Sequence, residues 1–242
     1  MDSLTGKTAL VTGAAGGIGA AIVKLFQDRG VTVAGADLQT SGAEYGIVGD
    51  LSDPSFCDNL PARAADKMGG LDILVNNAGI ITRGKITEAS DADFHASMAI
   101  NVEAPFRLCR AAIPLMAEAG GGAIVNIASC WGVHPGPNHP IYVMTKAAVA
   151  SLTQCLGIDH AHQNIRVNAV CPNEVNTPMI RTGFETRGLD LDKAIDALNA
   201  SVPLGRIAEP EDIADVVAFL ASDQARYLCG ALVEANGGKS VQ

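Results

Sequence analysis

The sequence predicts a doubly wound α/β fold built on a parallel sheet, and two features of the chain carry that prediction. Short apolar runs rich in β-branched residues alternate with segments of helical periodicity along all 242 residues, as successive strand–helix–strand units do. Several of these runs, such as Ile73–Val75 and Ile124–Ile127, are largely apolar, which is typical of strands covered by helices on both faces. Because no repeat or linker-like stretch interrupts the pattern, we expect a single domain over residues 1–242.

The individual elements follow from the local patterns. The predicted strands are Thr8–Thr12, Val31–Ala36, Ile47–Val48, Ile73–Asn76, Ala123–Ala128, Arg166–Val170 and Leu232–Glu234. The clearest predicted helix is Pro210–Ala221, where apolar residues recur at i, i+3, i+4 and i+7 after a proline that suits the first helical position. Further helices are predicted over Ala20–Phe26 and from Tyr142 through Ala161. The segment from Met179 to Ser201 has a helical pattern and mixed charge, and is interpreted either as a lid over a ligand or as a surface insertion.

Composition and charge exclude several classes of function. Hydrophobic residues make up 48% of the chain and the formal net charge is -9, so we expect neither a nucleic-acid partner nor attraction to anionic membranes. The six cysteines have neither the spacing nor the histidine partners of a metal site, and we expect buried, reduced thiols and no metal. The N-terminal residues lack the pattern of a signal peptide and no apolar run reaches about 18 residues, so a cytoplasmic protein is expected.

A glycine-rich turn follows the first predicted strand and leads into a helix. It reads Thr12-Gly13-Ala14-Ala15-Gly16-Gly17-Ile18-Gly19, and such a turn lets backbone N–H groups and a helix N-terminus approach a pyrophosphate closely. Asp37 follows the second strand, where a carboxylate can accept hydrogen bonds from the adenosine ribose and would repel a 2′-phosphate. Since neighbours such as Leu38 and Gln39 offer no basic side chain for that phosphate, the predicted cofactor is NAD rather than NADP.

Ser129, Tyr142 and Lys146 form a candidate catalytic group. Tyr142 and Lys146 are four residues apart, so both would project from one face of a helix, while Ser129 follows a predicted strand. Tyrosine, with a pKa near 10, is a poor base at neutral pH, but a positive charge at about 4 Å would stabilise the phenolate by about 4 kcal/mol at an effective dielectric of ~20. This arrangement predicts proton transfer from an alcohol as a hydride leaves the same carbon.

With these residues in view, the chain resembles the short-chain dehydrogenase/reductase family over nearly its whole length. The resemblance is carried by T-G-x-x-x-G-I-G at Thr12–Gly19, by N-N-A-G at Asn76–Gly79 and by the spacing of Ser129, Tyr142 and Lys146. It implies a Rossmann-type sheet of seven parallel strands with helices on both faces, and a homotetramer in which one subunit's tail, Lys239–Gln242, could approach a neighbour's active site.

The same resemblance implies roles for further residues. Asn101 matches a fourth catalytic position, where the family's asparagine holds a water that links the lysine to solvent. The implied cofactor-binding residues are Gly13, Gly17, Ile18, Gly19, Asp37, Leu38, Asp50, Leu51, Asn77, Gly79, Tyr142, Lys146, Val175 and Thr177. The segment Cys171–Pro178 resembles the family's P-G-x-V-x-T-P stretch, with Asn173 in place of the usual glycine, and we interpret Asn173 and Glu174 as residues on the substrate side.

The expected substrate pocket mixes polar and aromatic side chains. The predicted substrate residues are Ser129, Trp131, His139, Tyr142, Asn173 and Arg181, with Ile81, Arg83, His134, Ile141, Glu174 and Met179 as further lining. This mixture favours a small polar substrate, and either Arg83 or Arg181 could pair with a carboxylate. We therefore expect NAD-dependent oxidation of a sugar or sugar-derived acid, for example a 2-keto-3-deoxy sugar acid. The alternatives are 3-oxoacyl carrier-protein reduction, diol dehydrogenation and a non-catalytic NAD-binding regulator.

Overall fold

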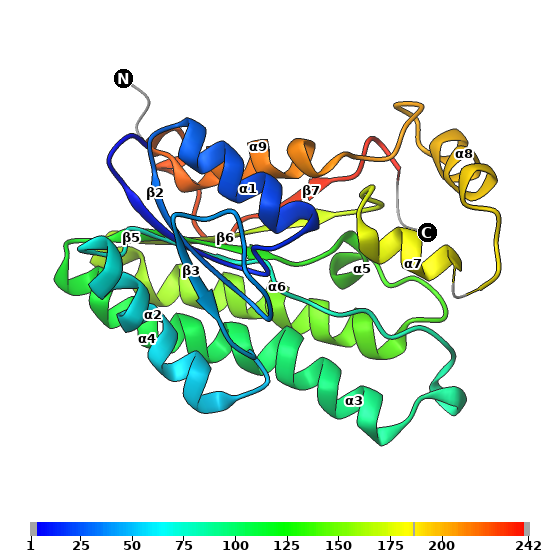
Figure 1. The fold of residues 1–242 in the computed structure, drawn as a ribbon, viewed down its shortest axis with the longest axis horizontal. Coiled ribbons are helices and arrows are strands. Elements are labelled where there is room, and N and C mark those ends of the chain that lie inside the picture. The colour runs from blue at the N-terminus through cyan, green and yellow to red at the C-terminus, as the bar shows by residue number, and fades with distance from the viewer. Residues whose placement is uncertain (1–3, 186, 240–242) are drawn as a thin grey trace.

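A sheet of seven parallel strands forms the centre of the computed structural model, which describes residues 4–185 and 187–239 (Figure 1). Within those residues the strand order is β3-β2-β1-β4-β5-β6-β7. The strands are β1 (Thr8–Thr12), β2 (Thr32–Asp37), β3 (Tyr45–Val48), β4 (Ile73–Asn76), β5 (Gly122–Ile127), β6 (Ile165–Pro172) and β7 (Leu232–Ala235). The predicted Rossmann-type fold with a seven-stranded parallel sheet is confirmed.

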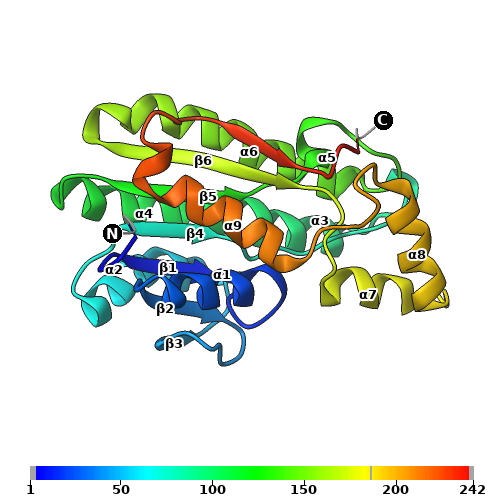
Figure 2. The ribbon, with the colours of Figure 1, turned by 90° about the horizontal axis from the view of Figure 1, so that it is seen from above.

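Helices cover both faces of the sheet (Figures 1 and 2). The helices α1 (Gly17–Asp28) and α9 (Pro210–Ala221) lie together on one face, and α2 (Pro54–Met68), α4 (Ala104–Glu118) and α6 (Pro140–His160) lie on the other. Shorter helices are α3 (Asp91–Met98), α5 (Cys130–Val133), α7 (Pro178–Glu185) and α8 (Leu191–Ser201). Figure 2 shows α7 and α8 beyond the end of the sheet, beside the segment that leaves β6.

Successive residues of the central strands feed two separate hydrophobic cores, because side chains alternate between the faces of a sheet. Val11 of β1 packs with Phe26 and Val217 from α1 and α9, whereas its neighbour Leu10 packs with Leu108 and other apolar residues of α2 and α4. All of β1 is buried, which explains why its sequence is apolar without alternation.

The predicted boundaries are correct to within one or two residues for most elements. Strands β1 and β4 and helix α9 match their predicted ranges, while helix α1 begins at Gly17, three residues before the predicted start at Ala20. Within the described chain, α6 is the one helix long and apolar enough to span a membrane. It packs against β5, β6 and β7, and Lys146 and Thr153 on it are buried, so it is a core helix of the fold.

Candidate active site

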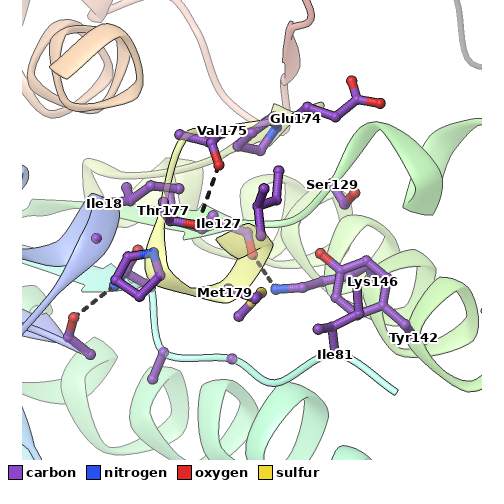
Figure 3. Close-up of a pocket in the computed structure, with 18 of the residues that line it drawn as sticks. Ile18, Ile81, Ile127, Ser129, Tyr142, Lys146, Glu174, Val175, Thr177 and Met179 are labelled. Atoms are coloured by element: carbon purple, nitrogen blue, oxygen red, sulfur yellow. Dashed lines mark hydrogen bonds between the residues drawn. The ribbon is translucent and has the colours of Figure 1, made fainter. Parts of the chain in front are cut away.

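A cavity of about 610 Å³ opens where the carboxyl ends of the central strands meet. Strands β1 and β4 are neighbours in the sheet while their following connections run to opposite faces, and such a switch point is where ligands bind in open α/β sheets. The lining comes from the turn after β1, the ends of β2, β4, β5 and β6, and helices α6, α7 and α8. Figure 3 shows Ile18 and Thr177 on one side of this cavity, and Ser129, Tyr142 and Lys146 on the other.

The glycine turn after β1 has little room for side chains. Gly13 and Gly17 have positive φ angles of 65° and 53°, a region that favours glycine. A Cβ at Gly13 would lie 2.8 Å from Asn77 Nδ2, and a Cβ at Gly19 would collide with the carbonyl oxygen of Gly13. The Asn77 side chain donates to the carbonyl oxygens of Thr12 and Gly13 at 2.9 and 3.1 Å. Asn77 therefore holds the turn in place from the β4 side.

Asp37 ends β2 at the far end of the cavity. Its Oδ2 accepts a hydrogen bond of 3.0 Å from the N–H of Ala15, which fixes the carboxylate against the glycine turn. Asp37 and Gln39 line the cavity, whereas Leu38 is 71% exposed and points elsewhere.

Asp50 and Leu51, predicted to contact adenine, lie between β3 and α2 and outside the cavity lining. The Asp50 carboxylate accepts from the Ser52 N–H at 2.8 Å, and Leu51 packs in the core on the α2 and α4 side. Their contact with a cofactor stays a prediction.

Ser129, Tyr142 and Lys146 converge at the other end of the cavity. Ser129 caps the N-terminus of α5, where its Oγ accepts from the Trp131 N–H at 3.1 Å. Tyr142 and Lys146 lie one turn apart on α6, with the Lys146 Nζ 5.9 Å from the centre of the Tyr142 ring. The Nζ donates a 2.8 Å hydrogen bond to the Ile127 carbonyl at the end of β5, and this bond is drawn in Figure 3.

The electrostatics of this group differ from the sequence-based expectation. Burial lowers the pKa of Lys146 from 10.5 to about 8, and burial also raises the pKa of Tyr142 above its usual 10. The contact with the Ser129 hydroxyl and the charge of Arg83 act in the opposite direction on Tyr142, but burial has the larger effect. The Lys146 ammonium is bound to the Ile127 carbonyl and is itself desolvated, and the balance of effects leaves the pKa of Tyr142 above its usual value.

Asn101 is buried in a π-helical turn, Ala99–Glu103, that joins α3 to α4. Turns of this type are frequent at functional sites. The Asn101 Oδ1 accepts from the Ile80 N–H, and the Nδ2 donates to the Ile80 carbonyl and to the Thr145 hydroxyl, all within 3.1 Å. Gly79 leaves the space between Asn101 and Lys146 open, since a Cβ there would lie 3.3 Å from both Asn101 Oδ1 and Lys146 Nζ.

The segment after β6 forms the upper wall of the cavity. Val175, Thr177, Asn173 and Glu174 all line it, and the side chain of Asn173 has a buried Nδ2 without a hydrogen-bond partner in the described chain. Glu174 Oε1 pairs with Lys239 Nζ at 2.6 Å. Lys239 also donates to Ser201 Oγ at 3.0 Å, so the C-terminal segment reaches the active-site end of its own subunit.

The structure places most of the predicted substrate residues in the cavity lining. Ser129, Trp131, His139, Tyr142 and Asn173 line it, and Arg181 does not. Trp131 and His139 line it with ring centroids 4.4 Å apart. Arg181 lies outside the lining, because its guanidinium binds Asn176 Oδ1 at 2.8 Å. His134, predicted as further lining, also lies outside it and pairs with Glu234. The prediction of residues 240–242 near a neighbouring active site lies outside the described residues.

Sequence reasoning missed four lining residues from the segment after β6. They are Ile180, Phe184, Arg187 and Leu198. The first three recur at i, i+4 and i+7 along α7 and its end, and this periodicity was the available signal that one face of the segment covers a cavity.

Comparison with known proteins shows the family. A family model described as enoyl-(acyl carrier protein) reductase matches residues 13–240. A crystal structure from Burkholderia xenovorans, described as a short-chain dehydrogenase/reductase, superposes with a TM-score of 0.92 at 31% identity over 100% of this chain and 99% of that one. The chain belongs to the short-chain dehydrogenase/reductase family. It is therefore an oxidoreductase that acts on CH–OH groups, and its family uses NAD(P).

Relatives within this family have different substrates. Oxidoreductase UcpA of Escherichia coli K12 is 33% identical over 100% of this chain and 97% of its own length. The 2,5-dichloro-2,5-cyclohexadiene-1,4-diol dehydrogenase LinX of Sphingobium indicum is 34% identical over 99% of this chain and 98% of its own.

Two further solved structures of the family are similarly close. Ligand-free aldohexose dehydrogenase of Thermoplasma acidophilum has a TM-score of 0.94 at 34% identity, covering 100% of this chain and 97% of that one. The 3-ketoacyl-(acyl-carrier-protein) reductase of Brucella melitensis, complexed with NADH, has a TM-score of 0.90 at 31% identity over 99% and 100%.

The residues of this short-chain dehydrogenase/reductase fit a dinucleotide. Helix α1 begins after Gly16, which provides no side-chain cap, so the N–H groups of its first turn face the cavity end uncapped. The positive φ at Gly13 and Gly17 keeps side chains out of this cradle, and Asp37 closes its far end. Glycine backbone, a free helix N-terminus and a carboxylate form the donor and acceptor set that a dinucleotide requires.

Proposed function

We propose that the protein oxidises a secondary hydroxyl of a small polar substrate with NAD, and that the substrate is a sugar or sugar-derived acid such as a 2-keto-3-deoxy sugar acid. The observation that supports this proposal is the wall of the cavity beyond Tyr142. Five polar side chains line the cavity there among apolar ones such as Phe184 and Leu198, and they are His139, Asn173, Glu174, Arg83 and Arg187. A fatty-acyl chain would leave these polar groups desolvated and unpaired.

The preference for NAD over NADP rests on Asp37. Its carboxylate is held by the Ala15 N–H at the end of the cavity where the adenosine ribose would lie, and its Oδ1 accepts no hydrogen bond within the described chain. A 2′-phosphate would meet this negative charge without a basic side chain in the adjacent lining, which consists of Gly13, Gly16 and Gln39.

The proposed chemistry assigns one task to each of four residues. Bound NAD⁺ would supply the hydride acceptor and a positive charge beside the phenol. Ser129 holds the substrate oxygen by a hydrogen bond, and Tyr142 removes the hydroxyl proton as general base. Lys146 lies one helical turn from Tyr142, and its ammonium together with the positive charge of bound NAD⁺ would stabilise the resulting phenolate. Asn101 positions the loop at Ile80 and supports the water through which the proton would reach solvent.

Asn173 is proposed as a substrate-binding residue. Its buried Nδ2 has no acceptor in the described chain, and such an unpaired donor costs about 1–3 kcal/mol unless a ligand satisfies it. A hydroxyl or carbonyl oxygen of the substrate would remove that cost. Asn173 adopts no left-handed backbone conformation, so the replacement of the family's usual glycine needs no strained turn.

A homotetramer in the cytoplasm is the expected state of the enzyme. Exposed apolar side chains on α4 and α6 support the proposed assembly, among them Phe106, Met144 and Ile158 with exposed fractions of 46%, 45% and 80%. Light scattering coupled to size-exclusion chromatography tests it, and a monomeric mass at micromolar concentration would refute it.

The substrate proposal is tested by measuring NADH formation with the purified protein. The panel should contain sugar acids, polyols, 3-hydroxyacyl thioesters and cyclic diols, each with NAD and with NADP. We expect the highest kcat/KM with NAD and a sugar acid or sugar. Activity confined to 3-hydroxyacyl thioesters with NADP would overturn both the substrate and the cofactor assignment, and activity confined to cyclic diols would overturn the substrate class alone.

A further inference from the structure

Two arginines from separate elements meet at the mouth of the cavity. Arg83 comes from the loop after β4, and Arg187 follows α7, a hundred residues later in the chain; both line the cavity. Gly183 lies between them. A Cβ at Gly183 would lie 2.5 Å from Arg83 Nη2, and the Gly183 carbonyl accepts a 2.8 Å hydrogen bond from Arg187 Nε. The two guanidinium groups therefore lie against the same residue.

Neither guanidinium has a carboxylate partner in residues 4–185 and 187–239. Apart from its hydrogen bond to the Gly183 carbonyl, Arg187 contacts the ring of Phe184, with 4.9 Å between the Arg187 Cζ and the ring centre. Arg83 makes one long hydrogen bond, 3.4 Å from Nη2 to the Met179 carbonyl. Most of their N–H donors thus have no acceptor in the described chain, although the protein as a whole is acidic with a net charge of -9.

The charges of the pair act on each other and on the catalytic end of the cavity. Burial and the neighbouring charge of Arg187 lower the pKa of Arg83. Both arginines also contribute to the lowered pKa of His139, behind the larger effect of burial, and Arg83 lowers the pKa of Tyr142. Both arginines are exposed, so solvent screens their mutual repulsion, and an anion bound at Gly183 would be attracted by both charges.

The acids of the described lining supply no counterion to the two arginines. Asp37 accepts from the Ala15 N–H beside the glycine turn, and the Glu174 carboxylate is paired with Lys239 at 2.6 Å. Figure 3 shows the Glu174 carboxylate pointing away from Tyr142 and Lys146. Neither of these two acids forms an ion pair with Arg83 or Arg187.

We propose that Arg83 and Arg187 together bind a carboxylate of the substrate, which makes this enzyme selective for hydroxy acids over the corresponding neutral alcohols. This inference rests on the proposed function, because it names the feature of the substrate that the same site recognises. Guanidinium groups bind carboxylates through two parallel hydrogen bonds, and the free N–H donors of both arginines permit such bonds. Arg83, Arg187 and Tyr142 line the same cavity, so one hydroxy acid would place its carboxylate at the arginines and its hydroxyl at the phenol.

The test uses a matched ligand pair and the chain's single tryptophan. Gluconate and sorbitol share their carbon chain and secondary hydroxyls and differ in the carboxylate, and Trp131 lines the cavity, so its fluorescence reports binding without turnover. In the Tyr142→Phe variant with NAD, where no hydroxyl is oxidised during the titration, we expect gluconate to bind at least tenfold more tightly than sorbitol. Arg83→Gln and Arg187→Gln should each weaken gluconate binding about tenfold or more, and should leave sorbitol binding within about twofold.

Arg181→Gln is the matched control, because Arg181 lies on α7, just before Arg187 in the chain, with its guanidinium bound to Asn176 outside the cavity lining. It should change neither affinity. Gly183→Ala tests the position of Arg83 without removing its charge. The added methyl group would displace the Arg83 guanidinium, so gluconate binding should weaken.

Four outcomes separate this inference from the proposed function. Equal affinities for gluconate and sorbitol, no gluconate binding at 10 mM, or equal losses of both ligands in the arginine variants would each overturn the carboxylate site. Discrimination as expected, combined with no NADH formation from any alcohol in the panel, would leave the carboxylate site intact and refute the proposed oxidation.

Discussion

Replacing Lys146 with methionine should inactivate the protein and also stabilise it. Lys146 is 5% exposed, and burial lowers its pKa from 10.5 to about 8. One pKa unit corresponds to about 1.4 kcal/mol, so holding the ammonium in the fold costs about 3 kcal/mol at neutral pH. The variant also loses the hydrogen bond to the Ile127 carbonyl, worth about 1 kcal/mol. The expected net gain at pH 7 is about 2 kcal/mol, or roughly 4–8 °C in Tm for a chain of this size.

This stabilisation should depend on pH in a specific direction. Because the folded state depresses the pKa of Lys146, the folded protein binds fewer protons than the unfolded chain between pH 8 and 10.5. The unfolding free energy of the wild-type protein therefore increases as pH rises through that window. The advantage of Lys146→Met should shrink by about 2 kcal/mol between pH 7 and pH 9.5.

Urea unfolding followed by circular dichroism at both pH values measures the effect. Lys24→Met is the matched control: Lys24 is 76% exposed in its surface pair with Asp28, and its removal should change stability by less than about 0.5 kcal/mol. A Lys146→Met variant that is less stable than the wild-type protein at pH 7, or whose stability difference does not vary with pH, would refute the reasoning.

Three further predictions concern the cofactor end and the fold. Asp37→Ser should shift the ratio of kcat/KM for NAD over NADP by about a hundredfold toward NADP, since the repelling charge is removed; an unchanged ratio in steady-state assays would contradict the role given to Asp37. Gly19→Ala should weaken NAD binding at least tenfold in calorimetric titrations, because the methyl group meets the Gly13 carbonyl, and unaltered affinity would show that the turn can widen. Arg166 donates to four carbonyls at the end of α9 and in the turn that follows it, so Arg166→Met should lower the unfolding free energy by about 3 kcal/mol, and a loss below 1 kcal/mol would contradict this.

The sheet and the catalytic cluster could be predicted because their signals are local or have fixed spacing. Buried parallel strands need continuous apolar runs, so β1 and β4 are found from sequence to the residue. Tyr142 and Lys146 are joined by the geometry of one helical turn, which sequence spacing specifies directly.

The parts that could not be predicted depend on contacts between distant segments. Arg181 and Arg187 lie close together in the sequence and have the same chemistry, yet Asn176 binds the first, while the second reaches the cavity beside Gly183. The balance of effects on Tyr142 likewise depends on burial and on the position of Arg83 from another element. No local pattern contains that information.

The measurement that tests the account most directly is the activity of Tyr142→Phe. Removing the phenolic oxygen leaves the ring and the cofactor cradle in place, so kcat should fall by about a thousandfold or more. The Kd for NAD, measured by calorimetry on the same preparation, should stay within about twofold of the wild-type value. A variant that keeps a tenth or more of the wild-type kcat would contradict proton transfer by Tyr142 and with it the proposed dehydrogenase chemistry.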